Sequence, residues 1–112
     1  MESDMAAATL DLDINEGDTF IMALDFWSDV DNTIPIDVTT STFTGSFRFG
    51  NTLVPMVVTQ STYAVNVIEA KVAYTAMVDL PTQGRYDIDQ LTDGDKFRLI
   101  QGNVRVSQEV TV

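Results

Sequence analysis

The sequence predicts an all-β protein, a two-layered antiparallel sandwich of about seven or eight strands, in which residues near 70–78 form either a strand or one short helical turn. Apolar and polar residues alternate with period two through most of the chain. Short turn signals rich in glycine, aspartate and asparagine separate the alternating runs. The 112 residues match one ordinary domain that can bury a core without disulfides or metals. We expect residues 1–8 to form a flexible arm and residues 9–112 a single sandwich domain.

The first two predicted strands lie between residues 10 and 27. Apolar residues alternate with acidic or amide residues over 10–15, and a Glu-Gly-Asp turn separates this run from a second strand over 20–27. Trp27 ends the second run on the face opposite its apolar residues. We expect Trp27 in the core or at its rim, whereas an exposed Trp27 would be a binding anchor. Residues 29–32 form a polar loop.

Two prolines constrain the strands of the middle region. Residues 34–38 are mostly apolar but contain Pro35, which cannot donate a ladder hydrogen bond, so at most a short edge strand is expected there. Residues 42–49 alternate clearly and predict a strand. Residues 53–60 predict another strand, which Pro55 places at a sheet edge or at a bulge.

The stretch 63–78 combines two patterns. Alternating valines favour a strand, whereas Asn66 with Glu69 three residues later resembles the start of a helix. We expect a strand over 63–68, followed by a strand or a short helical turn leading to Leu80 and Pro81.

The last third has clearer signals. Residues 84–89 predict a strand with Tyr86 and Ile88 facing inward, and Asp93-Gly94 predicts a hairpin turn. Residues 97–101 then alternate, and a last strand follows Gly102. We expect Tyr86 to hydrogen-bond nearby backbone and lock a sandwich corner, with a binding role as the alternative.

The charge of the chain is strongly acidic and uneven. The net charge is -11, and ten acids with no base precede Arg48. Binding to nucleic acids or anionic membranes depends on lysine and arginine, so neither partner is expected. The acidic half is either a solvated face that confers solubility or a surface that docks onto a basic partner.

Most catalytic and metal-binding chemistry is excluded by composition. The chain has no histidine and no cysteine, no Gly-x-Ser-x-Gly elbow and no Gly-rich phosphate loop. We therefore predict a protein that is not an enzyme and carries no cofactor. Asp11-x-Asp13-x-Asn15 lacks the glycine and glutamate of an EF-hand. A looser calcium site remains the alternative to a polar turn at Asp29, Asp31, Asn32 and Asp37.

The chain also lacks targeting signals. No apolar run approaches the roughly 18 residues of a membrane span, and residues 1–8 lack the basic start of a signal peptide. Together with the absence of cysteine, this predicts a non-secreted protein assembled in a reducing cytoplasm.

A series of short motifs carries a family resemblance. They are Gly17-Asp18-Thr19-Phe20, the pair Phe26-Trp27, Ile34-Pro35-Ile36-Asp37-Val38, Phe47-Arg48, Leu80-Pro81-x-x-Gly84-x-Tyr86-Asp87-Ile88, Asp93-Gly94, Arg98-Leu99-Ile100-x-Gly102-x-Val104-x-Val106 and Val110-Thr111. In this order they resemble the immunoglobulin-like β-sandwich modules of tailed-bacteriophage structural proteins, especially the N-terminal domain of baseplate upper proteins. The resemblance extends over residues 10–111.

The resemblance implies a non-enzymatic virion protein, assembled in the host bacterial cytoplasm. We expect an adaptor of the tail, baseplate or fibre-attachment region that binds other virion proteins and forms a homo-oligomer within the particle. The expected contact residues are Met1, Met5, Trp27, Pro35 and Pro55. A capsid decoration or head-fibre protein is the alternative with the same fold. A carbohydrate-binding module using Trp27 or Tyr74 is the alternative from another class.

Overall fold

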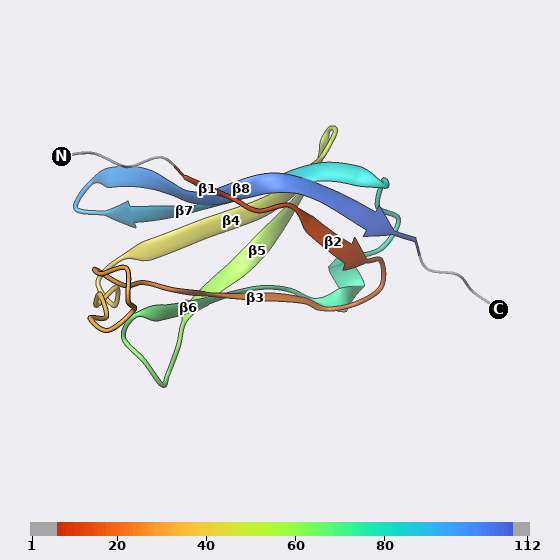
Figure 1. Ribbon diagram of the computed structural model, residues 1–112. Coiled ribbons are helices and arrows are strands. Elements are labelled where there is room, and N and C mark those ends of the chain that lie inside the picture. Colours follow the sequence, from red (N-terminus) through yellow and green to blue (C-terminus); the bar gives the residue numbers. More distant parts are fainter. Residues whose placement is uncertain (1–6, 109–112) are drawn as a thin grey trace.

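The computed structural model describes residues 7–108, and within them the regular secondary structure is almost entirely β-strand (Figure 1). The eight strands are β1 (Ala8–Thr9), β2 (Leu12–Asn15), β3 (Phe20–Asp25), β4 (Thr42–Phe49), β5 (Thr52–Gln60), β6 (Val67–Val72), β7 (Gln83–Thr92) and β8 (Asp95–Ser107). A single 3-10 turn, η1 (Tyr74–Ala76), lies between β6 and β7 and confirms the expected helical turn.

The strands form two layers that share β5. The hydrogen-bonded order is β1-β8-β7-β4-β5-β6-β3, with β2 also paired to β8. Residues 52–56 of β5 pair with β4, and residues 57–60 pair with β6. In Figure 1, β5 runs obliquely from the upper layer to the lower one. The large layer therefore holds β1, β2, β8, β7 and β4, and the small layer holds β6 and β3.

Pro55 lies where β5 has one strand neighbour. It pairs with Ser46 of β4, in the part of β5 that does not reach β6. The expectation of an edge position for Pro55 is confirmed. Pro35 makes one isolated β-bridge to Trp27 and belongs to no strand. This agrees with the prediction of at most a short edge strand over residues 34–38.

The β7–β8 hairpin is the longest paired unit of the large layer. Asp93 and Gly94 form its two-residue turn with φ angles of 50° and 83°, a left-handed conformation that Gly94 adopts without strain. The predicted turn is confirmed. The expectation of two strands after it is wrong, because β8 continues through Gly102 for 13 residues. A register shift beside Asp89 leaves Leu99 as the extra residue of a bulge.

The first predicted strand, residues 10–15, is a strand only over β2, and the separate two-residue strand β1 precedes it, with a break in pairing between the two. β1 and β2 both pair with β8, and they do so in parallel. Leu10 lies between them, half exposed rather than in the core. Its carbonyl accepts a 2.6 Å hydrogen bond from the Tyr86 hydroxyl, and its N–H donates to the Gln101 carbonyl at 3.0 Å. Gly102 makes this possible, because a Cβ there would lie 2.1 Å from the Leu10 oxygen.

The strand expected over 63–68 is displaced toward the C-terminus. β6 begins at Val67, and Tyr63 is 96% exposed in the preceding loop. Asn66 is buried, and its side-chain amide donates to the Phe26 carbonyl at 3.1 Å. Asn66, which resembled a helix start in the sequence, is thus used for a tertiary hydrogen bond. This bond holds the chain at the beginning of β6.

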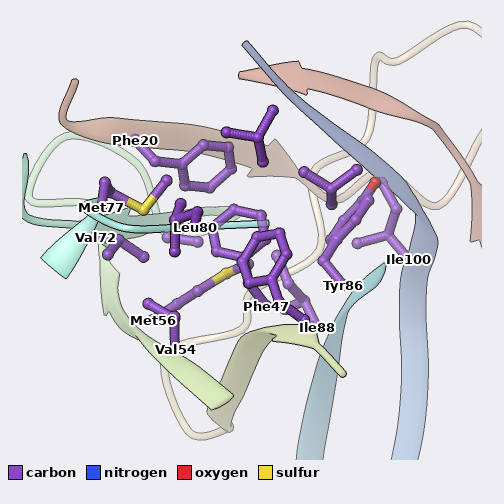
Figure 2. Close-up of a cluster of buried hydrophobic side chains, with 14 residues drawn as sticks. Phe20, Phe47, Val54, Met56, Val72, Met77, Leu80, Tyr86, Ile88 and Ile100 are labelled. Carbon is purple, nitrogen blue, oxygen red and sulfur yellow. The ribbon is translucent and has the colours of Figure 1, made fainter. Parts of the chain in front are cut away.

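The core lies between the two layers (Figure 2). Phe20 of β3 meets Phe47 of β4 edge-on, with ring centroids 4.8 Å apart. Tyr86 and Ile88 of β7 face inward, as predicted. Met77 and Leu80, from the segment after η1, are buried at the end of this cluster.

Candidate interaction surfaces

The carboxylates of the loop after β3 stabilise the loop itself. Asp29 accepts hydrogen bonds from the Thr33 hydroxyl and from the N–H groups of Thr33 and Ile34. These bonds, the Thr33 hydroxyl first, hold the pKa of Asp29 below its ordinary value. The Asp37 carboxylate similarly binds the hydroxyl and N–H of Thr39, which lowers the pKa of Asp37.

Metal binding finds no support in this arrangement. Within residues 7–108, no group of three or more acidic side chains is placed to hold an ion. Asp29 and Asp37 each accept hydrogen bonds from groups of their own turn. This is the arrangement expected of a polar turn, the alternative to a calcium site in this segment. The same described part of the chain contains no helix that is long and apolar enough to cross a membrane.

One groove lies on the large layer. It measures about 440 Å³ and runs across β2, β8 and β7. Asp11 lines it, but its carboxylate accepts the Asn103 N–H at 2.9 Å. Asp13 and Arg105 also line it. Without an imidazole or thiol nearby, these groups do not form a nucleophile–base pair.

Several large apolar side chains are exposed at one end of the sandwich. We call it the loop end: residues 26–41 and 61–66. The two loops are tied by hydrogen bonds from the Val38 N–H to the Val65 carbonyl and from the Phe26 N–H to the Asn66 carbonyl, each 2.9 Å. Its exposed large apolar side chains are Val30, Ile34, Ile36, Tyr63 and Val65. Val30 is 98% exposed, so the packing of this domain does not require it.

The loop end includes two of the predicted contact residues. Trp27 is half-buried, and its Nε1 donates to the Asp25 carboxylate at 2.7 Å. It bridges Pro35, which is exposed. Pro55 is exposed on β5 in the half that pairs with β4, away from this end of the strand. Met1 and Met5 lie outside the described residues.

The aromatic residues expected for a carbohydrate site are far apart. Trp27 lies two residues after the end of β3, whereas Tyr74 lies two residues after the end of β6 that pairs with the first residue of β3. The six-residue ladder between them spans about 20 Å. Trp27 and Tyr74 therefore lie at opposite ends of the small layer and cannot stack on the same sugar.

Strand β3 is a second candidate surface, which the sequence argument missed. It ends the strand order, and its pairing partner within the described residues is β6 alone. The signals that could have indicated it are the regular alternation of 20–25 and the absence of bases before Arg48. Those signals identify a strand in the acidic half of the chain but not its position at an edge.

The comparisons with known proteins identify the fold. No family model matches the sequence, and no curated protein matches it. Among solved structures, the chain is similar to the BTLA ectodomain, with a TM-score of 0.50 and 12% sequence identity over 87% of this chain and 89% of that one. At this identity the likeness shows the fold: this chain is an immunoglobulin-like β-sandwich.

Proposed function

We propose that this protein is a non-enzymatic structural module of a tailed-bacteriophage particle, an adaptor in the tail, baseplate or fibre-attachment region. Its role is to bind other virion proteins. The sandwich supplies a rigid body, and the motifs from Gly17-Asp18 to Arg98-Leu99-Ile100-x-Gly102 supply the resemblance to phage structural modules. Placement in the virion rests on that resemblance.

The observation that carries a binding role is the apolar loop end. Five large apolar side chains are exposed on two loops that are hydrogen-bonded to one another. Exposed apolar residues gathered in one region are typical of protein interaction sites. Assembly of many copies by symmetry multiplies weak contacts, so a small surface of this kind suffices.

The test is incorporation into purified particles. We expect the wild-type protein to co-purify with particles in a fixed copy number and cryo-electron microscopy to place it in the tail or baseplate. Val30→Lys and Ile34→Lys should reduce incorporation, because each places a charge in the loop end. Thr82→Lys, at an exposed position between η1 and β7, is the matched control and should be incorporated normally.

Two results would contradict the proposal. Absence of the protein from purified particles would remove the virion role altogether. Location on the capsid surface would replace the tail adaptor by a decoration or head-fibre protein.

A further inference from the structure

One side of β3 is unpaired along the whole strand. Residues 20–25 pair with residues 72–67 of β6, and no described residue pairs with the opposite side. The Phe26 N–H donates to Asn66 on the β6 side. Because amide directions alternate along a strand, the N–H and C=O groups of Ile21, Ala23 and Asp25 face the open side.

This edge has few of the devices that normally prevent strand addition, since its one charged residue is Asp25 at the end of the strand. Natural edges are protected by lysine, proline, bulges or very short strands. β3 reads FIMALD over its six residues, contains none of these residue types, and pairs without a register shift. In contrast, the half of β5 that has a single neighbour contains Pro55. The regular, unprotected edge of β3 is therefore suited to receive another strand.

The core is incompletely covered beside this edge. Met22 and Leu24 of β3 pack on the core but are only half-buried, as are Leu12 and Ile14 of β2 in the facing layer. A groove of about 270 Å³ lies between β2 and the start of β3, where Phe20 and Ile21 line it. An inward side chain of an added strand beside Phe20 would enter this groove, and those beside Met22 and Leu24 would cover their half-buried side chains.

Acids lie at the groove and along β3. Asp13 and Asp18 line the groove, and Asp25 lies at the other end of β3. Both bordering strands come from the part of the chain that contains no lysine or arginine. Lys71, across from Ile21 on β6, is the one base in register with β3. Two copies of a chain with a net charge of -11 repel each other, so the charge favours a basic partner rather than self-pairing.

We propose that β3 accepts an extended segment of a partner protein that alternates apolar residues with lysine or arginine. The apolar residues lie beside Phe20, Met22 and Leu24: the one beside Phe20 enters the groove toward β2, and the others cover the half-buried side chains of Met22 and Leu24. The basic residues lie on the outer face, opposite Ile21, Ala23 and Asp25 and near Glu69. Main-chain hydrogen bonds supply affinity and the alternating side chains supply specificity. That the partner is a virion protein rests on the function proposed above.

The test uses peptides of about eight residues, enough to cover one strand of typical length. The probe alternates lysine and valine. One control replaces lysine by glutamate, and another has the same composition in two blocks. We expect saturable binding of the alternating peptide, followed by the fluorescence of Trp27, the single tryptophan. Each control should bind at least about tenfold more weakly.

Hydrogen exchange locates the bound strand. The amides of Ile21, Ala23 and Asp25 should gain protection on binding, whereas those of Met22 and Leu24, already bonded to β6, should change little. Equal binding of the block peptide, or protection confined to another strand, would overturn the proposal. So would dimerisation through β3 without peptide, detected by sedimentation and concentration-dependent protection.

Matched variants separate strand addition from general charge effects. Ala23→Pro removes an edge N–H while leaving the β6 ladder intact, and should abolish binding. Ala23→Lys should weaken it at least about tenfold. Thr59→Lys adds the same charge beside the same neighbour, Glu69, but on the far side of β6, and should bind normally. Equal binding by Ala23→Lys and Thr59→Lys would contradict strand addition at β3.

The two proposals fail in different ways. If the protein co-purifies with particles but the peptide gives no protection at β3, strand addition is wrong and the virion role stands. If the peptide binds at β3 but the protein is absent from particles, the virion role is wrong and the edge site stands. If Ala23→Lys loses the peptide but enters particles normally, the partner of β3 is not a virion protein.

Discussion

Strands β7 and β3 differ in how many strands they pair with and in whether their acidic side chains have basic partners. β7 lies between β4 and β8, and its acids face bases of its own hairpin. Arg98 Nε is 3.1 Å from Asp89, Lys96 Nζ is 3.5 Å from Asp89, and Arg98 is 3.6 Å from Asp87. The hydrogen bond to Asp89, with the charges of Asp87 and Asp89, raises the pKa of Arg98.

β3 pairs with one strand, β6. β3 and β2, the strand of the facing layer on its open side, carry acids and no bases. A strand with internal partners contributes mainly to stability, whereas a strand with unused hydrogen-bonding groups and uncompensated charge is available for recognition. Substitutions in the β7–β8 hairpin should therefore change the free energy of unfolding, and substitutions at β3 should change binding instead.

The largest expected loss of stability is at Gly102. In Gly102→Ala the new Cβ would lie 2.1 Å from the Leu10 carbonyl oxygen, so the β1–β2 connection must move. We expect about 3 kcal/mol of destabilisation in chemical denaturation, typical of overpacking. Gly94→Ala is the control: its Cβ meets nothing within 4 Å, and its positive φ costs about 1 kcal/mol. Equal losses in the two variants would contradict the close packing at Gly102.

Removal of the Tyr86 hydroxyl should have the next largest effect. Tyr86→Phe loses the 2.6 Å bond to Leu10, and we expect a loss of about 1.5 kcal/mol at neutral pH. Burial, and then the charge of Asp11, raise the pKa of Tyr86 in the folded state. The folded protein therefore holds this proton more tightly than the unfolded chain does.

Because the pKa of Tyr86 is raised on folding, the free energy of unfolding depends on pH. The contribution from this raised pKa should be fully present below the ordinary tyrosine pKa of about 10 and be lost as the pH rises through the folded-state value. Thermal melts from pH 8 to 11 should show this decline in the wild type and a smaller one in Tyr86→Phe. Tyr63→Phe, at an exposed tyrosine, should retain the wild-type profile.

A matched pair of charge changes compares the two strands directly. Arg98→Met leaves Asp89, which is 5% exposed, with Lys96 as its remaining ion pair, and should cost about 1 kcal/mol. Asp25→Asn keeps an oxygen that can accept the Trp27 N–H and should change stability by less than about 0.5 kcal/mol. Urea denaturation measures both. A larger loss in Asp25→Asn would show that the acidic edge is structural.

The smallest expected effect is in the loop after β3. Thr33→Val removes the hydroxyl that chiefly lowers the pKa of Asp29, so the Asp29 pKa should rise toward its ordinary value. A lowered carboxyl pKa gives stability above the ordinary value of 3.8 that is lost as the pH falls through the folded-state value. NMR titration of the carboxyl groups measures the shift. Thr39→Val should change Asp37 and leave Asp29 unaffected.

Much of the fold could be predicted because it depends on neighbouring residues. Alternation places Phe47, Tyr86 and Ile88 inward, and Asp93-Gly94 adopts the backbone angles of a two-residue hairpin. The candidate surfaces were harder to find. Trp27 and Pro35 were expected as contacts and lie together at the loop end, but the exposure of Val30 and Tyr63 depends on which loops meet there.

By itself, the sequence determined the all-β class, the inward face of most strands, the main hairpin and the acidic character of the first half. The tertiary structure decided where the first strand breaks, where β6 begins, how β5 divides between two layers and which edge is left open. Each of these depends on residues far apart in the chain, such as the close contact of Leu10 with Gly102 or the hydrogen bond from the Asn66 side chain to the Phe26 carbonyl. A period-two pattern records which face of a strand is buried but contains no information about the neighbour at its side.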